Sequence, residues 1–195
     1  MKQIFSLLIF SFFSLDLQAE TPAINSKKSA ALIEVIVSGS GCPQKQSKPI
    51  QLNIESDQVQ VPIDFEIELS GANLVRKTCQ ARITINGTPN FHYEVREVSQ
   101  NMLFNVQKKS NMHAEISFGI LGQQDFKIDQ DVKEVGEYRH ILLKKLINYS
   151  TPCGKNSVLR IQTDVRSSGG GKNNFKAEPV ALRLEKSACE MPPTN

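Results

Sequence analysis

Regular alternation of apolar and polar residues is the feature that most constrains what this chain can fold into. From Val59 to Leu69 every second residue is apolar, and polar residues or a proline stand between them. Successive side chains of a β-strand point to opposite faces, so such a segment offers one face to a core and the other to solvent. Similar alternation recurs in residues 33–37, 50–54, 79–85, 91–95, 114–120, 159–165 and 180–184. So many strand candidates predict an all-β protein.

The turn residues between these segments favour antiparallel strands. Asn86-Gly87 stands between two alternating runs and predicts a β-hairpin. Pro62 lacks a backbone donor and predicts an edge strand or the entrance to a strand, and the glycine-rich residues 167–174 separate the last two long strands. The pattern predicts an antiparallel β-sandwich, with a β-barrel as the second choice. Residues 131–148 fit one short helix or a buried strand, and both remain open.

The first residues have the pattern of an export signal. Lys2 precedes an apolar stretch from Ile4 to Leu15, and Ala19 offers a small residue for cleavage. That stretch is shorter than the roughly 20 residues of a membrane-spanning helix, and no later segment is apolar enough to be one. The first cysteine lies far beyond the cleavage point. We therefore expect a secreted or periplasmic protein that has no lipid anchor and, once the signal is removed, no membrane span.

The length that remains after cleavage suits one domain with a sizeable core. We expect four parts along the chain: a signal peptide at 1–19, a flexible N-terminal extension at 20–32, a single β domain at 33–190 and a C-terminal tail at 191–195. The formal net charge of +3 is ordinary for a protein of this size. It neither demands nor excludes a polyanionic partner.

Four cysteines, Cys42, Cys79, Cys153 and Cys189, follow the export signal. In an oxidising compartment an even set of thiols predicts two disulfides and no free thiol. Three connectivities are possible, and we favour Cys42 with Cys79 and Cys153 with Cys189 because these close the shortest loops. In the chain-entropy view, closing two loops of about 37 residues stabilises the fold by about 4 kcal/mol each.

The segments around the cysteines resemble a family of secreted, cysteine-containing proteins called domain of unknown function 4360. The matching elements are Gly39-Ser40-Gly41-Cys42-Pro43, Arg76-Lys77-Thr78-Cys79-Gln80, Thr151-Pro152-Cys153-Gly154, Leu159-Arg160 and Cys189. The resemblance spans nearly the whole chain after the signal. It implies an exported, mainly β domain with paired cysteines, and it implies no established activity or catalytic residue.

Residues that could carry catalysis or bind a metal are few. Cys42 on its glycine-rich turn would have to stay reduced to act as a nucleophile, which export disfavours. The only histidines, His92, His113 and His140, lack the spacing of a zinc-binding helix. Asp64, Glu66 and Glu68 share one strand face and fit either a solvated face or the paired carboxylates of a glycoside hydrolase. We expect no cofactor and no metal.

Basic residues are concentrated in the second half of the chain, between Arg139 and Lys186. Arg160 and Arg166 lie an even number of positions apart, so a regular strand places both on one face. These two arginines are the candidate anion-binding residues, and an anionic glycan of the envelope or extracellular space is the expected partner, with no role for nucleic acid. We expect a non-enzymatic binding or structural module. The alternative is a secreted hydrolase that uses paired carboxylates.

Overall fold

The computed structural model of the chain describes residues 32–42, 50–53, 57–70, 74–120 and 125–189. The expected signal peptide and C-terminal tail lie outside these residues, as does the expected extension except for Leu32. The described residues contain only strands and their connections, so the all-β prediction is confirmed. None of them forms a helix long and apolar enough to cross a membrane.

The described part of the chain forms ten strands, and all pairings among them are antiparallel. Their bounds are β1 Leu32–Ser38, β2 Ile50–Asn53, β3 Gln58–Val61, β4 Phe65–Ser70, β5 Val75–Ile85, β6 Phe91–Ile120, β7 Phe126–Ser150, β8 Ser157–Gly169, β9 Lys172–Ala177 and β10 Val180–Ala188. Residues 131–148 therefore belong to a strand, which decides the question that the sequence pattern left open.

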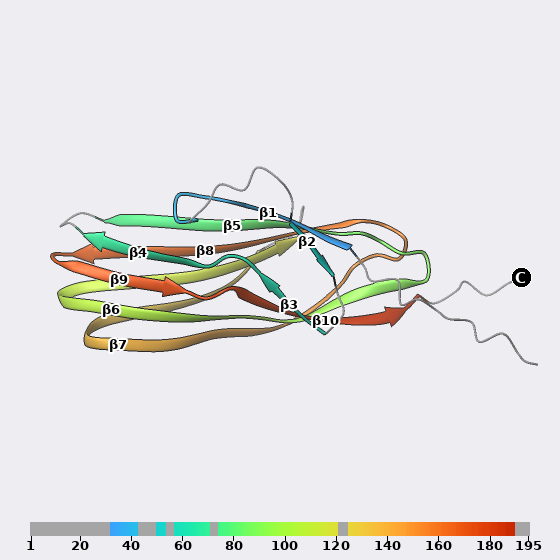
Figure 1. Cartoon of the computed structure of the whole chain (residues 1–195). Helices are drawn as coiled ribbons and strands as arrows, with labels where there is room; N and C mark the ends of the chain where they lie inside the picture. Colours follow the sequence, from blue (N-terminus) through green and yellow to red (C-terminus); the bar gives the residue numbers. More distant parts are fainter. Residues whose placement is uncertain (1–31, 43–49, 54–56, 71–73, 121–124, 190–195) are drawn as a thin grey trace, which may run out of the picture.

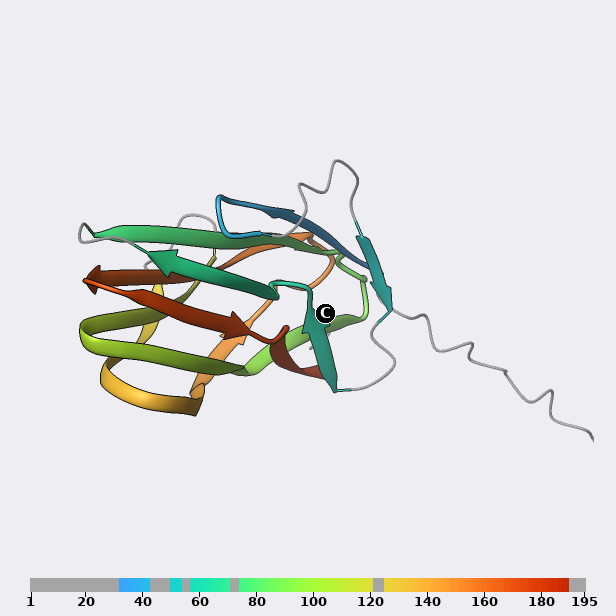
Figure 2. The same ribbon diagram turned by 60° about the vertical axis from the view of Figure 1, so that its left-hand side comes forward.

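The strands form one continuous sheet that folds over into two layers (Figure 1). The first, called here the β5–β8 layer, has the order β2, β1, β5, β8, second half of β6, first half of β7. The second, the β9–β10 layer, contains β3, β4, β9, β10 and the other halves of β6 and β7. Figure 2 shows the bent strands joining the layers at one end. The prediction of an antiparallel β-sandwich is confirmed.

Strands β6 and β7 pass from one layer to the other because their pairing is interrupted at the bend. The register between them shifts on both sides of Val106, and Lys109 adopts a left-handed φ of 62°. Bulges of this kind turn a strand sharply without ending it. Beside this bend, β8 leads into β9 through Gly169 and Gly171, which have φ values of 99° and 120°. The glycine-rich segment is thus a corner between the layers, where left-handed backbone favours glycine.

Apolar side chains of both layers meet in one core between them. In the β9–β10 layer the rings of Phe65 and Phe104 flank Phe175, with centroid distances of 5.3 and 5.1 Å. Gln100 is a buried polar residue between the layers, at 1% exposure, and its Oε1 accepts a hydrogen bond from Thr163 Oγ1 of the opposite layer at 2.7 Å. The two layers are therefore joined by a polar contact as well as by apolar packing.

The alternating segment from Val59 to Leu69 is two strands, with Pro62 in the break between them. This outcome agrees with the expectation that Pro62 marks a strand entrance. A second break lies beside it at Glu178, where β9 gives way to β10. Gln100 Nε2 donates to the Ile63 carbonyl at 2.9 Å and to the Glu178 carbonyl at 2.7 Å. One side chain thus satisfies backbone acceptors at both breaks.

The predicted hairpin at Asn86-Gly87 is wrong. Strand β5 pairs with β1 and β8, while the first half of β6 lies in the other layer, so this connection crosses between layers. Gly87 is needed for a different reason. A Cβ at this position would lie 2.3 Å from the Lys155 carbonyl oxygen, and the Gly87 amide donates to Asn156 Oδ1 at 3.0 Å.

Two disulfides are present, and they join Cys42 to Cys79 and Cys153 to Cys189. The predicted pairing is confirmed, and no free cysteine occurs among the described residues. The first bridge ties the end of β1 to the middle of β5. The second ties the turn before β8 to the end of β10. Two such bridges are typical of proteins that fold in an oxidising compartment.

Candidate functional site

The outer face of the β5–β8 layer is polar, and it is called here the polar face. Strands β5 and β8 pair without interruption from Val75 opposite Ser167 to Ile85 opposite Ser157. Alternate residues point away from the core, as the burial pattern of both strands shows. The outward side chains of the two strands are Arg76, Thr78, Gln80, Arg82 and Thr84 of β5 and Val158, Arg160, Gln162, Asp164 and Arg166 of β8.

Four arginines of the polar face form two cross-strand pairs. Arg76 lies directly opposite Arg166, and Arg82 lies directly opposite Arg160. Side chains at such positions have Cβ atoms about 5 Å apart, and like charges there destabilise a sheet. The two pairs are separated by six residues along each strand, or about 20 Å. The same arrangement therefore occurs twice on one face.

Asp164 offsets the charge of the first arginine pair. Its Oδ2 accepts from Arg76 Nε at 2.5 Å and from Thr78 Oγ1 at 2.9 Å, and its Oδ1 accepts from Arg166 Nε at 2.9 Å. The carboxylate is 1% exposed. Burial alone would raise the pKa of Asp164, but the hydrogen bonds from Arg76, Thr78 and Arg166 outweigh it and lower the pKa. Asp164 is therefore held ionised between two guanidinium groups.

The second arginine pair has a different counterion. Arg160 forms an ion pair with Asp125, which precedes β7. Gly119 of β6 leaves the space for this carboxylate, since a Cβ at that position would overlap Asp125 Oδ1. A Cβ at Gly119 would require the Asp125 carboxylate to move from this position. Glycine here serves a close approach and not a turn.

Acidic residues dominate the part of the polar face that β6 and β7 form. Glu115 lies opposite Asp164 on one side and Asp129 on the other. Glu115 accepts from Lys127 Nζ at 3.0 Å, and Asp131 Oδ1 lies 2.8 Å from His113 Nδ1. The polar face thus has four arginines on β5 and β8 beside a region on β6 and β7 that carries Glu115, Asp129 and Asp131 together with Lys127 and Lys133.

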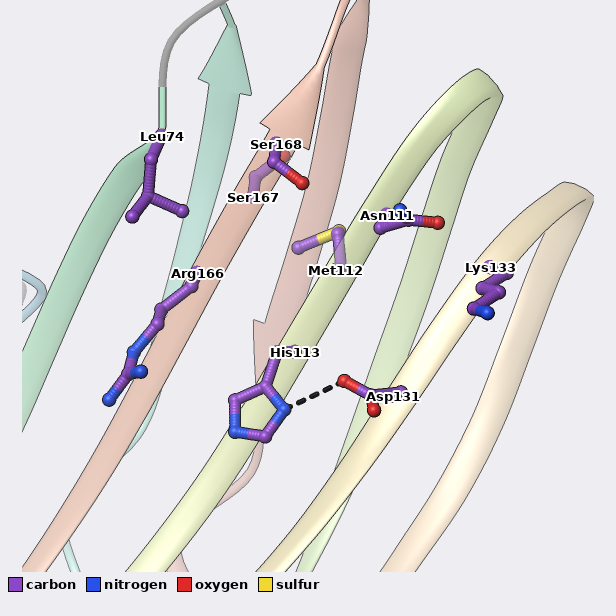
Figure 3. A pocket seen from close by; sticks show the side chains of 9 residues that line it. All are labelled: Leu74, Asn111, Met112, His113, Asp131, Lys133, Arg166, Ser167 and Ser168. Carbon is purple, nitrogen blue, oxygen red and sulfur yellow. Dashed lines mark hydrogen bonds and ion pairs between the residues drawn. The ribbon is translucent and has the colours of Figure 1, made fainter.

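Two hollows lie on this face, one near each arginine pair. The first has a volume of about 420 Å³ and is lined by residues that include His113, Asp131 and Arg166 (Figure 3). Figure 3 shows these side chains projecting from β6, β7 and β8, with Leu74 at the rim of β5. The second hollow has a volume of about 620 Å³ and is lined in part by Arg82 and Arg160. Both hollows therefore contain guanidinium groups.

Arg160 and Arg166, the residues expected to bind anions, both lie on the polar face, and each lines a different hollow. Other bases of the same stretch of sequence lie on the β9–β10 layer and are paired with acids. Lys172 contacts Glu68 at 3.4 Å and Lys176 contacts Glu66 at 3.7 Å. The basic segment is thus divided between two surfaces of the molecule.

The carboxylates considered for hydrolysis lie away from the hollows. Glu66 and Glu68 occupy the outer side of β4, where lysines of β9 neutralise them, and Asp64 is exposed just before that strand. None of the three lines either hollow of the polar face. Their alternation reflects a solvated strand face.

Sequence reasoning missed Arg76, Arg82 and Asp164. A signal for the two arginines exists, because the interval from Arg76 to Arg82 equals the interval from Arg160 to Arg166. Because the two intervals are equal, a single antiparallel register between the two strands places Arg76 opposite Arg166 and Arg82 opposite Arg160. The register itself could not be read from the sequence. Asp164 gave no signal because a lone acid in a basic segment is ordinary.

Comparison with known proteins identifies the family. A family model described as domain of unknown function (DUF4360) matches residues 28–185, so the chain belongs to this family. No curated protein matches it significantly.

Solved structures resemble the chain only distantly. A carbohydrate-binding module named TmCBM61, in complex with β-1,4-galactotriose, is 10% identical, with a TM-score of 0.35 over 78% of this chain and 88% of that one. A structure of infectious bursal disease virus Gt strain is 9% identical, with a TM-score of 0.36 over 82% of this chain and 53% of that one. A family 11 carbohydrate-binding module from Clostridium thermocellum, in complex with a mixed-linked tetrasaccharide, is 10% identical, with a TM-score of 0.27 over 79% and 96%.

Proposed function

We propose that this member of the DUF4360 family is an exported, non-enzymatic binding module that holds an anionic glycan along its polar face. The proposal rests on the cross-strand arginines of β5 and β8. Arg76 lies directly opposite Arg166, and Arg82 lies directly opposite Arg160. Such pairs destabilise the sheet unless an anionic group lies between or above the two guanidinium groups. Asp164 and Asp125 provide only part of that compensation.

The first arginine pair is oriented for a ligand. Arg76 and Arg166 both use Nε to hold Asp164, and these are the hydrogen bonds that they make to described residues. Each guanidinium group has five N–H donors, so the terminal nitrogens of both can donate outward. A guanidinium group fixed at Nε is already ordered before the ligand arrives, which lowers the entropic cost of binding.

The distance between the pairs indicates the form of the ligand. Two basic positions about 20 Å apart on one face fit repeated negative charges along an extended polymer better than a single small anion. Gln80 and Gln162 lie opposite each other between the pairs and offer amide donors and acceptors for hydroxyl groups. A polysaccharide that carries carboxylates at intervals supplies both kinds of group.

The carboxylates of the polar face favour binding over hydrolysis. A glycoside hydrolase needs one carboxylic acid that holds its proton and a second carboxylate across a cleft. Asp164 lies opposite Glu115, but its pKa is lowered by its hydrogen bonds to the arginines and to Thr78. A carboxylate held ionised in this way does not serve as the proton donor. The two disulfides and the expected signal peptide support export.

Binding to a soluble polyuronate tests the proposal. We expect polygalacturonate to bind the wild-type protein at low salt, with an affinity that falls steeply as salt rises. The neutral polymer dextran should not bind. The double variants Arg76→Gln/Arg166→Gln and Arg82→Gln/Arg160→Gln should each bind at least tenfold more weakly. The matched control Lys172→Gln/Lys176→Gln removes the same charge from the other layer and should stay within twofold of wild type.

Isothermal titration calorimetry of these four proteins gives the affinities. The proposal is wrong if wild type does not bind polygalacturonate at low salt. It is also wrong if the lysine control loses as much affinity as the arginine variants, since net charge would then explain the binding without any site.

A further inference from the structure

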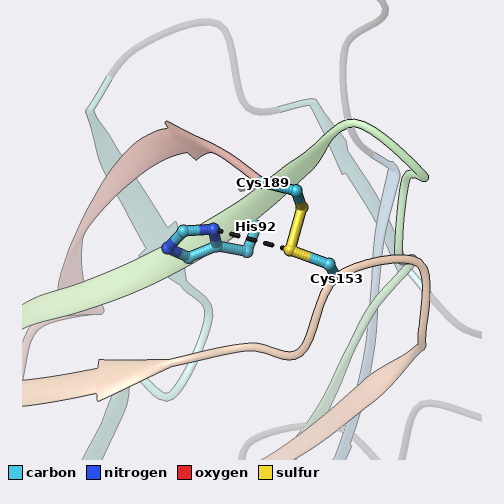
Figure 4. A group of neighbouring side chains, drawn as sticks. All are labelled: His92, Cys153 and Cys189. Atoms are coloured by element: carbon cyan, nitrogen blue, oxygen red, sulfur yellow. Dashed lines mark hydrogen bonds between the residues drawn. A yellow bond between two sulfur atoms is a disulfide. The ribbon is translucent and has the colours of Figure 1, made fainter. Parts of the chain in front are cut away.

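His92 lies beside the Cys153–Cys189 disulfide, away from the polar face. Its Nδ1 atom is 3.8 Å from Cys153 Sγ. The imidazole nitrogen and the two sulfur atoms all lie within 4.8 Å of one another. Figure 4 shows the imidazole of β6 turned toward the bridge, which joins the turn before β8 to the end of β10. Three potential metal ligands are therefore gathered from three distant parts of the sequence.

The spacing of these atoms is close to that of a tetrahedral metal site. With metal–sulfur bonds of about 2.3 Å and metal–nitrogen bonds of about 2.0 Å, tetrahedral angles place sulfur and nitrogen about 3.6 Å apart. The distance from His92 Nδ1 to Cys153 Sγ, 3.8 Å, already agrees with this value. Two sulfur ligands would be about 3.8 Å apart. The two sulfurs have to separate, and a Cα–Cα distance of 6.0 Å leaves room for side-chain rotation to do so. The Cys189 sulfur already lies within 4.8 Å of the imidazole nitrogen.

A carboxylate orients the imidazole. His92 Nε2 lies 3.3 Å from Glu94 Oε1, on the side of the ring away from the disulfide. Glu94 is itself held by an ion pair with Arg96. A hydrogen bond from Nε2–H to a carboxylate leaves Nδ1 unprotonated and facing the sulfurs, as carboxylates that accept from the other ring nitrogen do for metal-binding histidines.

This disulfide is the more accessible of the two. Cys153 lies in an exposed turn, whereas Cys79 of the other bridge is fully buried in β5. Thiol–disulfide exchange requires an incoming thiolate to approach one sulfur in line with the bond. An external dithiol can therefore reach the Cys153–Cys189 bridge more readily than the Cys42–Cys79 bridge, in which Cys42 is half-buried and Cys79 is buried.

We propose that reduction of the Cys153–Cys189 disulfide creates a metal site in which both thiolates and His92 Nδ1 bind one Zn²⁺ ion. An external dithiol supplies the two electrons and two protons, becomes a disulfide, and leaves Cys153 and Cys189 as thiols. Zn²⁺ then displaces the two thiol protons, and a water molecule completes the tetrahedron. The oxidised protein holds the same residues in a closed bridge and does not bind the ion. Metal binding at this end of the sandwich thus depends on redox state.

Titration with Co²⁺ as a spectroscopic probe tests the proposal. A phosphine reductant avoids competition for the metal, because it contains no thiol. We expect reduced wild-type protein to bind one Co²⁺ per chain with absorption bands of tetrahedral thiolate coordination, and Zn²⁺ to remove these bands. The oxidised protein should show none.

Three variants localise the site. His92→Ala should weaken binding at least tenfold, and Glu94→Gln by about tenfold, as expected for a residue that orients a metal-binding histidine. Cys153→Ser/Cys189→Ser should abolish the thiolate bands. His113→Ala is the matched control, since His113 also contacts a carboxylate but lies on the polar face, and it should bind as wild type does.

Circular dichroism decides the case in which reduction unfolds the protein. Zn²⁺ should then restore the β spectrum of reduced wild type but not of reduced His92→Ala. The proposal is overturned if Cys153→Ser/Cys189→Ser keeps the thiolate bands, if His92→Ala binds as wild type does, or if reduced wild type neither binds Co²⁺ nor refolds with Zn²⁺. These outcomes are independent of whether a glycan binds the polar face.

Discussion

At the scale of single residues, Asp164 shows how a carboxylate can be buried on the outer side of a sheet. It is 1% exposed, yet three side chains donate to its two oxygens. A buried charge without such partners would cost several kcal/mol. In return, the carboxylate keeps Arg76 and Arg166 in place opposite each other. The geometry of the arginine pair therefore depends on Asp164.

Replacing this carboxylate should destabilise the fold in a pH-dependent way. We expect Asp164→Asn to lower the free energy of unfolding by about 2 kcal/mol at neutral pH, because hydrogen bonds to a charged group are lost. The folded-state pKa of Asp164 is lowered from its ordinary value of 3.8, so its contribution is present above that value and is lost as pH falls through the folded-state pKa.

Urea unfolding of both proteins between about pH 3 and pH 7 checks this expectation. The difference between wild type and Asp164→Asn should be constant above about pH 5 and should shrink toward acid. A difference that grows as pH falls, or that is the same at every pH, would contradict the role assigned to Asp164.

Gly87 provides a second prediction at this scale. A Cβ there would meet the backbone of Lys155, which cannot rotate away, so Gly87→Ala should cost about 1–3 kcal/mol. Gly170→Ala is the control, since a Cβ at Gly170 meets nothing within 4 Å. It should change stability by less than about 0.5 kcal/mol. Thermal unfolding compares the two, and equal losses would mean that the close approach at Gly87 is unimportant.

At the scale of elements, β6 and β7 decide the architecture, because each runs through both layers of the sandwich. Their bends place the polar face on one layer and the lysine–glutamate pairs of β4 and β9 on the other. Where β3 meets β4 and β9 meets β10, the side chain of Gln100 replaces the missing backbone partners. Gln100 is thus a structural part of two strand breaks.

Replacing Gln100 with an apolar residue should leave backbone groups without partners. We expect Gln100→Leu to destabilise the protein by about 2–4 kcal/mol, since the Ile63 and Glu178 carbonyls and the Thr163 hydroxyl each lose a buried hydrogen bond. Gln107→Leu, at an exposed position of the same strand, should change stability by less than about 0.5 kcal/mol. Chemical denaturation of both variants measures this. A Gln100→Leu protein as stable as wild type would show that the breaks do not need the amide.

Local pattern was enough to predict the all-β class, the sandwich and both disulfides, because alternation is a property of short segments and the favoured cysteine pairing followed from loop lengths. It left residues 131–148 open between a helix and a strand, and it gave no strand candidate for β9, whose first residues were expected in the glycine-rich connection. The segments 91–95 and 114–120 were not recognised as parts of one strand, since the bend near Lys109 interrupts the pattern. The connection after β5 looked like a hairpin because Asn86-Gly87 has hairpin chemistry, but tertiary packing sends β6 to the other layer.

The candidate site was predictable only in part, because tertiary packing decides which strands lie side by side. Alternation placed Arg160 and Arg166 on one face, as the structure has them. Their partners come from β5, and strand pairing between segments so far apart is set by the whole fold. His92, Cys153 and Cys189 come from three segments far apart in the sequence, so no local pattern could predict that the ring of His92 lies beside the second disulfide.

At the scale of the whole molecule, the sandwich separates two surfaces of different character. The polar face carries the arginine pairs and both hollows, whereas the outer side of β4 and β9 carries glutamates matched with lysines. The outward residues of β5 and β8 belong to one layer, and the pairs of β4 and β9 belong to the other. A long polymer can therefore lie along β5 and β8 without contacting the other layer.

Mapping of backbone amide chemical shifts during titration with a galacturonate oligomer tests the central claim most directly. We predict shift changes in β5 and β8 that are largest around Arg76, Arg82, Arg160 and Arg166, with none in β4 and β9. Shift changes centred on β4 and β9, or spread evenly over both layers, would contradict a binding site on the polar face.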